Sequence, residues 1–328
     1  MKIAVLGAGA WGSALAISLA QSHAVRLWTR DPAASAILEK QRASPYLPQC
    51  AFPAALAIEP RLERAVEPAE LVIVATSTAG LRPVAEAVAR IDREPDLLWA
   101  CKGFESASRR LPHEIVAEAL PRAARVGALS GPSFALEVAM GLPTALVVAS
   151  RDAGFAASMA AALNSQRLRL YSTEDVAGVE LGGAVKNVIA IAAGISDGLA
   201  LGRNARAALV TRGLAELVRL GVALGGHAET FMGLAGVGDL VLTCTGDLSR
   251  NREVGVRLSQ GKPLARVLEE LGHVAEGVQS ASTVRDLARE RSVEMPITEA
   301  VCAVLFDGVP PADAVQGLLA RNPRAELR

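Results

Sequence analysis

The sequence predicts an α/β protein with a doubly wound, mostly parallel sheet, followed by an all-helical carboxy-terminal domain. Short apolar runs alternate with helical stretches over the first half of the chain, and a glycine-rich turn joins the first run to the first helix. After about residue 180 the strand-like runs stop, and long segments rich in Ala, Leu and Val at helical spacing replace them. Continuous apolar strands separated by helices are typical of a parallel sheet covered on both faces.

The length and the change of period also predict the division into domains. A chain of 328 residues is long enough for two hydrophobic cores. We expect a sheet domain over residues 1–180 and a helical domain over residues 181–328. A ligand is expected in the cleft between them.

Apolar periodicity places the individual elements. The expected strands are Lys2–Leu6, Val25–Trp28, Leu71–Ala75, Leu97–Cys101, Arg125–Leu129, Thr144–Ala149 and Leu168–Tyr171. The expected helices are Ser13–Gln21, Leu81–Arg90, Leu111–Leu120, Gly182–Ala200, Ala205–Leu224, Arg252–Ser259, Ala281–Glu290 and Thr298–Phe306.

The charge and the cysteines exclude several classes of protein. Lys+Arg and Asp+Glu both number 34, so no global positive field attracts nucleic acid or an anionic membrane. Cys50, Cys101, Cys244 and Cys302 are far apart and form no CxxC pair. We therefore expect no metal site and no disulfide framework, and we expect a reducing cytoplasm as the location.

The first turn is glycine-rich. Gly7-Ala8-Gly9-Ala10-Trp11-Gly12 fits the pattern G-x-G-x-x-G and lies directly between a strand and a helix. The first glycine permits the tight turn, the second lets the backbone approach a pyrophosphate, and the third lets the helix pack on the strand. This position favours dinucleotide binding by a Rossmann-like domain over an ordinary glycine turn.

The end of the second strand bears on the choice of dinucleotide. An NAD-selective site usually has an acidic residue there for the ribose 2′-hydroxyl, whereas this chain has Arg30 followed by Asp31. Arg30 could pair with a 2′-phosphate, which favours NADP over NAD or use of both. The alternative is that Arg30 is a solvated loop residue and Asp31 caps the next helix.

Polar residues follow two further strands. Lys102 comes directly after the strand ending at Cys101, and Ser130-Gly131-Pro132-Ser133 follows the strand ending at Leu129. Strand ends of a doubly wound sheet point at the ligand crevice, so Lys102 could meet a phosphate or a carbonyl oxygen. The Gly-Pro-Ser turn could hold an anion, although simple turn chemistry explains it equally well.

Lys186 lies inside the most apolar segment of the chain, Leu181–Leu201. That segment is a poor membrane span and a good buried helix. Burying an ammonium is costly unless it is paired or functional, and desolvation lowers its pKa toward neutrality, where it can exchange a proton. A lysine whose head reaches solvent at the helix edge is the alternative, and the adjacent Asn187 argues against it. Gly182 and Gly183 would let another backbone or a cofactor approach.

Two later segments could complete the site. Asp239 lies in a tight Gly-flanked turn and could hold a lysine ammonium in place, or it could cap a helix. Ser249 is a plausible N-cap for a helix whose first residues are Arg250 and Asn251. A helix N-terminus with a hydroxyl, Arg and Asn suits a phosphate, and plain capping is again the alternative.

Taken together, these segments resemble the bacterial NAD(P)-dependent glycerol-3-phosphate dehydrogenase family over essentially the whole chain. The matching stretches are VLGAGAWGSALA, KGFE, LSGPSFALEV, LGGAVKNVIAIAAGISDGL, FMGLAGVGDLVLTCTGDLSRNR and AEGVQSA. The chain departs from the family pattern at Cys101, where Thr or Ser is usual, and at Asp31, where His or Arg is common.

The resemblance implies roles for individual residues. Lys186 would be the general acid and base, with Asp239 orienting it. Substrate contacts are implied for Lys102, Gly131, Ser133, Asp239, Ser249, Arg250 and Asn251. Cofactor contacts are implied for Gly7, Gly9, Ala10, Trp11, Gly12, Arg30, Lys102, Ala135, Arg250, Val274 and Glu276.

The expected reaction is hydride transfer between NAD(P)H and the C2 carbonyl of dihydroxyacetone phosphate, giving sn-glycerol 3-phosphate for phospholipid synthesis. The expected partner is therefore a small phosphorylated molecule, without nucleic acid or membrane insertion, and the chain is expected to form a homodimer. Two rivals stay open: an NADP-dependent β-hydroxy-acid dehydrogenase, and a non-catalytic dinucleotide sensor.

Overall fold

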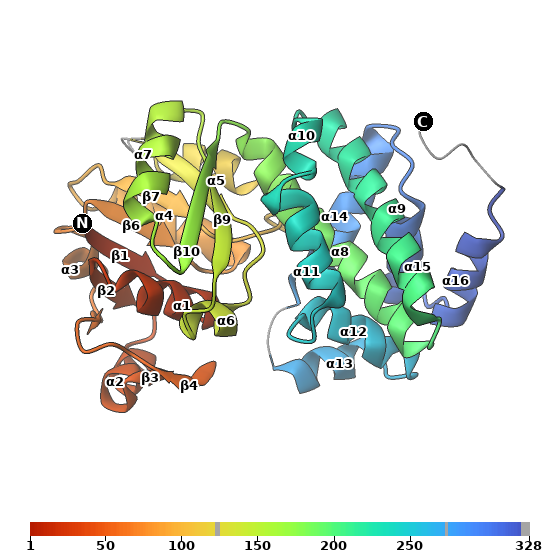
Figure 1. Cartoon of the computed structure of the whole chain (residues 1–328), viewed down its shortest axis with the longest axis horizontal. Helices are drawn as coiled ribbons and strands as arrows, with labels where there is room; N and C mark the ends of the chain where they lie inside the picture. Colours follow the sequence, from red (N-terminus) through yellow and green to blue (C-terminus); the bar gives the residue numbers. More distant parts are fainter. Residues whose placement is uncertain (122–124, 273–274, 323–328) are drawn as a thin grey trace.

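The computed structural model describes residues 1–121, 125–272 and 275–322. They form two parts that lie side by side, a sheet flanked by helices and a bundle of helices (Figure 1). The long helix α8, Val176–Gly198, leads from the first part into the second. The expected architecture, an open sheet followed by a helical domain, is confirmed.

The sheet is mostly parallel, as predicted. Within the described residues it has eight strands in the order β10-β9-β8-β7-β6-β1-β2-β5. Their bounds are β1 Lys2–Leu6, β2 Ala24–Trp28, β5 Ala57–Ile58, β6 Leu71–Val74, β7 Asp96–Trp99, β8 Val126–Ser130, β9 Thr144–Ala149 and β10 Leu168–Thr173. The pair β8–β9 is antiparallel, with Leu129 opposite Val148, and the other neighbouring pairs are parallel.

Helices cover both faces of the sheet because the strand residues alternate between two cores. Ile3 and Val5 of β1 join one core with residues of α1 (Ala10–Leu19) and α7 (Ala153–Leu163). Ala4 and Leu6 join the other with residues of α4 (Thr78–Ala89) and α5 (Pro112–Ala119). Burial on both sides explains why β1 reads as a continuous apolar run.

Several short elements were not expected from the sequence. They are β3 Ala43–Ser44, β4 Leu47–Ala51, α3 Leu62–Val66, α6 Ala135–Ala139, α10 Ala228–Phe231, α13 Leu264–Leu271 and α16 Pro311–Leu319, besides β5 and α7. The helix α2, Pro32–Gln41, is the one that the capping interpretation of Asp31 requires. Most have too few turns or too few buried positions for a period to stand out. No residue of α16, for example, is buried.

The second part is built around α8. The helices α9 (Gly202–Ala223), α12 (Arg250–Ser259), α14 (Glu276–Glu290) and α15 (Pro296–Phe306) pack against it. By length and composition α8 could cross a membrane, but 94% of its most apolar window is buried inside the protein. It is therefore the core helix that the sequence predicted. A boundary at residue 181 falls inside α8.

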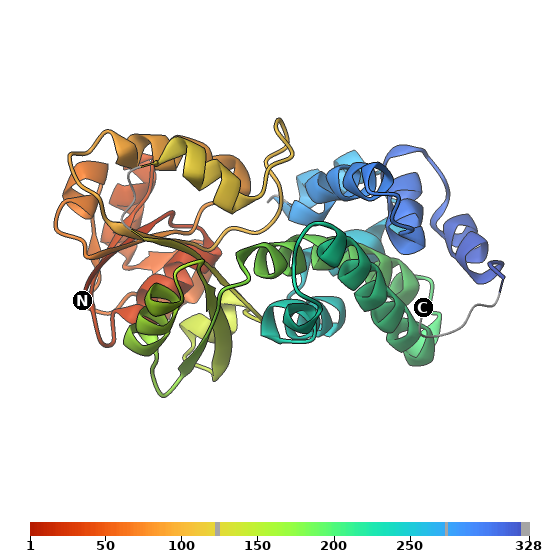
Figure 2. The same cartoon turned by 90° about the horizontal axis from the view of Figure 1, so that it is seen from above.

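The segment that follows β7 also links the two parts. Figure 2 shows it extending from the sheet toward the helices of the second part. Arg109 of this segment forms an ion pair with Glu290 at the end of α14, with 2.6 Å between the charged atoms. Lys102 lies near the start of the same segment, so the chain places this lysine where the two parts meet.

Candidate active site

The glycine turn after β1 has the geometry that its sequence predicts. Gly7 has a φ of +118°, and a Cβ there would lie 2.8 Å from the carbonyl oxygen of Ala75. At Gly12 a Cβ would lie 1.8 Å from the carbonyl oxygen of Gly7, so only glycine lets α1 start this close to the strand. At Gly9 a Cβ would meet no heavy atom of the described residues within 4 Å.

Open space beside Gly9 is what a dinucleotide requires. Gly9 is exposed and precedes the first residue of α1, Ala10, and no side-chain cap is found there among the described residues. Ala10 and Trp11 are half-buried. The first amides of the helix can therefore bind the oxygens of a pyrophosphate, and the residues present fit the cofactor that the sequence predicts.

Arg30 and Asp31, at the end of β2, make different contacts. The carboxylate of Asp31 caps α2, accepting a hydrogen bond from the backbone N–H of Ala33 at 2.9 Å. The capping interpretation of Asp31 is thus the correct one. Arg30 is exposed at the end of β2. The cation of Arg30 can therefore contact a ligand at this strand end, whereas one oxygen of Asp31 is engaged in the helix cap.

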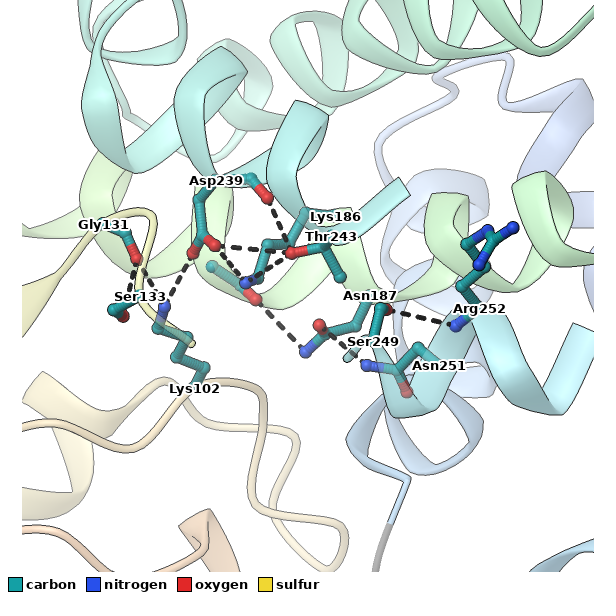
Figure 3. Close-up of polar contacts among 11 residues, drawn as sticks. Lys102, Gly131, Ser133, Lys186, Asn187, Asp239, Thr243, Ser249, Asn251 and Arg252 are labelled. Carbon is teal, nitrogen blue, oxygen red and sulfur yellow. Dashed lines mark hydrogen bonds and ion pairs between the residues drawn. The ribbon is translucent and has the colours of Figure 1, made fainter. Parts of the chain in front are cut away.

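The centre of the site is one carboxylate between two lysines (Figure 3). Lys102 Nζ donates a hydrogen bond to Oδ2 of Asp239 at 2.6 Å, and Lys186 Nζ donates one to Oδ1. Lys102 comes from the strand end after β7, Lys186 from α8 and Asp239 from α11 (Asp239–Thr245). The structure therefore brings together three residues that the sequence placed 53 to 137 positions apart.

Burial changes the acid–base properties of this cluster. Asp239 is 1% exposed and Lys186 is 6% exposed. Burial lowers the pKa of Lys186 to about 8, although the charge of Asp239 acts in the opposite direction. Burial alone would raise the pKa of Asp239, but the charges of Lys102 and Lys186 outweigh it and lower that pKa. Near neutral pH, Asp239 is ionised and Lys186 can exchange a proton.

Two glycines of α8 make this arrangement possible. A Cβ at Gly182 would lie 2.3 Å from the carbonyl oxygen of Ala235, so the neighbouring backbone could not approach. A Cβ at Gly183 would lie 3.3 Å from Cδ of Lys102. The prediction that these glycines admit another backbone is confirmed, and the second also makes room for the stem of a lysine.

The surroundings of Asp239 differ from the expected tight turn. The residues before it, Leu234–Gly238, form a π-helical turn (η1), and Asp239 is the first residue of α11. The prediction of a tight turn was wrong because glycine-flanked segments more often form tight turns than π-helical turns. The π-helical turn leads directly into a helix whose first side chain, Asp239, reaches both lysines.

Thr243 belongs to the cluster, and sequence reasoning missed it. Its hydroxyl accepts a hydrogen bond from Lys186 Nζ at 3.0 Å and donates one to the backbone carbonyl of Asp239 at 2.6 Å. Thr243 follows Asp239 by four residues, so the two lie on one face of α11. That spacing could have identified it once α11 was known to be a helix.

Gly131 and Ser133 lie on the sheet side of the cluster. The carbonyl of Gly131 accepts hydrogen bonds from Lys102 Nζ at 3.1 Å and from the hydroxyl of Ser133 at 3.0 Å. Gly131 has a φ of +134°, which a larger residue would rarely adopt. The turn after β8 is thus shaped to direct one carbonyl at Lys102, and Ala135 begins α6 immediately after it.

Ser249 and Asn251 form a second polar group. The hydroxyl of Ser249 accepts the backbone N–H of Arg252 at 3.3 Å, which confirms Ser249 as the N-cap of α12. Asn251 donates to the side-chain oxygen of Asn187 at 2.9 Å and accepts the N–H of Gly277 at 3.0 Å. Both side chains are buried. Asn187, next to Lys186, therefore links this group to the lysine cluster.

Other predicted residues stand outside these hydrogen bonds. Arg250 is exposed, and Glu276 is a half-buried residue that begins α14. Burial raises the pKa of Glu276, and the charge of Arg250 opposes that shift. Within the described residues no hydrogen bond connects the glycine turn, Arg30 or Ala135 to the lysine cluster. Val274 lies outside the described residues.

Metal ligands are not grouped in the described part of the chain. There, no set of three or more His, Cys, Asp or Glu side chains could hold a metal ion. The cysteines at 50, 101, 244 and 302 are free and buried.

Comparison with known proteins matches nearly the whole chain. Residues 2–156 match the family model described as the N-terminus of NAD-dependent glycerol-3-phosphate dehydrogenase. Residues 175–316 match the model described as the C-terminus of the same enzyme.

Individual relatives agree with the family models. The chain is 58% identical to glycerol-3-phosphate dehydrogenase [NAD(P)+] of Thiobacillus denitrificans over 328 residues, which is 100% of both chains. It is 55% identical to the protein of the same name from Nitrosospira multiformis, again over 100% of both. A crystal structure of glycerol-3-phosphate dehydrogenase from Coxiella burnetii is similar with a TM-score of 0.92 and 42% identity, covering 97% of this chain and 98% of that one.

Proposed function

The chain belongs to the NAD-dependent glycerol-3-phosphate dehydrogenase family, and from this premise we propose that Lys186 is the proton donor and acceptor of its reaction. The protein is an NAD(P)-dependent glycerol-3-phosphate dehydrogenase that interconverts dihydroxyacetone phosphate and sn-glycerol 3-phosphate. The observation that supports the role of Lys186 is its burial beside Asp239 and Lys102, where its pKa falls to about 8.

Cofactor binding is assigned to the glycine turn and to the end of β2. The open space beside Gly9 and the uncapped start of α1 suit a pyrophosphate. Arg30 would contact the 2′-phosphate of NADP, whereas Asp31, the carboxylate next to it, has one of its oxygens engaged in the cap of α2. We therefore favour NADP over NAD. When bound, the reduced nicotinamide supplies the hydride.

Proton transfer is assigned to Lys186. In the reducing direction its ammonium donates a proton to the oxygen that was the C2 carbonyl, and in the oxidising direction the neutral amine accepts one. Asp239 holds Nζ in place and stabilises the protonated form of Lys186. Thr243 accepts a second hydrogen bond from Nζ and so fixes the orientation of the ammonium. A lysine with a pKa close to the working pH performs both tasks well.

Lys102 is assigned to the substrate. Its Nζ lies between Asp239 and the carbonyl of Gly131, at 2.6 and 3.1 Å. A substrate oxygen that approaches this point meets a second ammonium, which stabilises negative charge developing at C2. Gly131 and Ser133 complete the same side of the site.

The substrate phosphate is assigned to the start of α12. Arg250 is exposed there and provides a cation, while the backbone amides of the first turn provide hydrogen-bond donors. The side chains of Ser249 and Asn251 are buried and hydrogen-bonded to neighbouring residues, so we assign them mainly a structural role. They hold the turn that presents Arg250.

The two rival interpretations account for fewer of these features. A β-hydroxy-acid dehydrogenase would need a group for a carboxylate, and its substrate would make no use of a helix start built for phosphate. A dinucleotide sensor would have no use for a buried lysine tuned to exchange a proton. The family models and the full-length relatives support the glycerol-3-phosphate reaction instead.

An absorbance assay of reduced nicotinamide tests the proposed function. The protein is mixed with NADPH or NADH and, in separate reactions, dihydroxyacetone phosphate, dihydroxyacetone or a β-keto acid. We expect rapid oxidation with dihydroxyacetone phosphate, slow oxidation with dihydroxyacetone, and none with the β-keto acid. Oxidation with the β-keto acid but not with the phosphate ester would support the first rival. Binding of dinucleotide without oxidation of any substrate would support the sensor.

The wider setting is also a proposal. A supply of glycerol 3-phosphate suits phospholipid synthesis in the cytoplasm, and a homodimer stays a prediction from the sequence. Light scattering on the purified protein measures the oligomeric state, and a mass equal to one chain of 34.0 kDa would contradict the dimer.

A further inference from the structure

We propose that Asp197 is a positioning residue for the phosphate end of the substrate and that it acts through Arg252 on the first turn of α12. The inference rests on the proposed function, because it presumes that the start of α12 receives a phosphate. Asp197 lies near the end of α8, eleven residues after Lys186, inside a stretch that resembles the family, but it has been given no role and lies outside the proton-transfer cluster.

An ion pair links Asp197 to α12. Oδ2 of Asp197 accepts a hydrogen bond from Nε of Arg252 at 2.7 Å, and the two side chains are 16% and 18% exposed. Because the pair is largely shielded from solvent, its attraction is screened less than that of a typical surface ion pair. Arg252 also donates to the carboxylate of Asp247, just before the helix, at 3.1 Å. Its guanidinium therefore ties α8 to the loop that leads into α12.

The backbone of Arg252 is fixed as well. Its N–H donates to the hydroxyl of the N-cap Ser249. Its carbonyl oxygen lies 1.9 Å from the point where a Cβ at Gly194 would stand, and a Cβ at Gly255 would lie 2.1 Å from the carbonyl of Ile191. The two helices thus touch backbone to backbone, and the first turn of α12 rests directly on α8.

These contacts separate the tasks of two neighbouring arginines. Arg252 is engaged by two carboxylates, so its guanidinium is directed away from a phosphate and serves to anchor the turn. Figure 3 shows the side chain of Arg252 on the opposite side of Ser249 and Asn251 from the lysine cluster. Arg250 is left to contact the ligand. Removing Asp197 would release Arg252, loosen the turn and move Arg250 and the amides away from the phosphate.

The chain offers a matched control. Arg206 of α9 binds the same carboxylate, with its NH1 at 3.2 Å from Oδ1 and 3.0 Å from Oδ2 of Asp197. It carries the same charge as Arg252 but belongs to a helix that does not carry the phosphate site. If any ion pair of Asp197 were enough to maintain substrate binding, removing Arg206 would also raise KM for the phosphorylated ketone. If Asp197 acts through α12, removing Arg206 leaves that KM unchanged.

The experiment compares Asp197→Asn, Arg252→Met and Arg206→Met with the wild type on two ketones, dihydroxyacetone phosphate and dihydroxyacetone, with NADPH in excess. For Asp197→Asn and Arg252→Met we expect KM for the phosphorylated ketone to rise about tenfold, with kcat at saturation within about threefold. The specificity constant for dihydroxyacetone and KM for NADPH should stay within about twofold, as should all values for Arg206→Met. The double variant Asp197→Asn/Arg252→Met should lose little more than either single one, since both break the same link.

Each contrary result has a clear meaning. A folded Asp197→Asn with an unchanged KM for the phosphorylated ketone would overturn the inference, and so would an equal loss on both ketones or an equal loss in Arg206→Met. If Asp197→Asn does not fold, Arg252→Met alone decides by the same criteria. A wild-type enzyme that reduces both ketones equally well would instead overturn the proposed phosphate site, and the inference would fall with it.

Discussion

Lys102 and Lys186 bind opposite oxygens of the same buried carboxylate, that of Asp239, although one lysine follows a strand of the sheet and the other lies in the core helix of the second part. The contact joins the two parts of the molecule at the place where substrate is expected. It also makes the protonation of Lys186 depend on burial and on the charges of Asp239, Lys102 and Glu276.

This arrangement predicts opposite pH dependence for the two directions of the reaction. Burial lowers the pKa of Lys186 to about 8. Reduction of dihydroxyacetone phosphate needs the protonated amine, so its kcat should fall as pH rises through about 8. Oxidation of glycerol 3-phosphate needs the neutral amine, so its kcat should rise over the same range. Steady-state kcat from pH 6 to 10 in both directions checks this, and profiles that run in the same direction would contradict it.

The glycine turn predicts different consequences for two alanine substitutions. At Gly9 a Cβ meets no heavy atom of the described residues, so Gly9→Ala should keep the thermal midpoint of the wild type while raising KM for the cofactor about tenfold or more. At Gly12 a Cβ would lie 1.8 Å from the carbonyl of Gly7, so Gly12→Ala should lower the midpoint itself. Calorimetry and cofactor titration measure the two effects, and loss of stability in Gly9→Ala would contradict the assignment.

Arg30 and Asp31 should separate cofactor preference from stability. Arg30→Ala should raise KM for NADPH about tenfold or more and change KM for NADH little, because only NADPH carries the 2′-phosphate. Asp31→Ala removes the cap of α2, so it should cost about 1 kcal/mol of stability without changing the ratio of the two KM values. Kinetics with both cofactors and denaturant unfolding test this pair. A changed ratio in Asp31→Ala would show that its carboxylate takes part in cofactor selection.

A buried carboxylate outside the site predicts a pH effect on stability. Glu216 of α9 accepts the backbone N–H groups of Ile297 and Thr298 at the start of α15, and burial raises its pKa to about 7. A raised pKa means that the folded state keeps a proton which the unfolded state releases above about 4.5. The stability contributed in this way is complete at low pH and is lost as pH rises through about 7.

The variant Glu216→Gln isolates that effect, because the amide does not titrate. The unfolding free energy of the wild type relative to Glu216→Gln should decrease between pH 5 and pH 8, by no more than about 3 kcal/mol. Urea unfolding at several pH values measures the difference. A relative stability of the wild type that increases with pH would contradict the raised pKa.

Much of the fold could be predicted because the strands of the sheet and the long helices have strong periods. The apolar run Ile3–Leu6 and the segment around Lys186 are buried, and such segments stand out in a sequence. The short elements between β2 and β6 could not be predicted, because pairings such as β3 with β4 depend on contacts that a local pattern does not contain.

Individual residues of the site could be predicted from the sequence, but only the fold shows how they contact one another. Lys186 could be identified because an ammonium in an apolar helix is costly. Asp239 was also expected to hold a lysine ammonium, and its contact with Lys186 is confirmed. The π-helical turn that leads into α11 was not predicted, because the glycines of Leu234–Gly238 also suit a tight turn. Thr243 and Asp197 are common residue types in ordinary positions, and their contacts become visible only when α8, α11 and α12 are packed together.

The most direct test of the account is the activity of Lys186→Met with dihydroxyacetone phosphate and NADPH, measured alongside the affinity for NADPH. Methionine keeps most of the length of the side chain and removes the amine that carries the proton. We expect kcat to fall by about a thousandfold or more while the dissociation constant of NADPH stays within about threefold of the wild type. A variant that folds, binds NADPH and turns over at close to the wild-type rate would show that another group carries the proton.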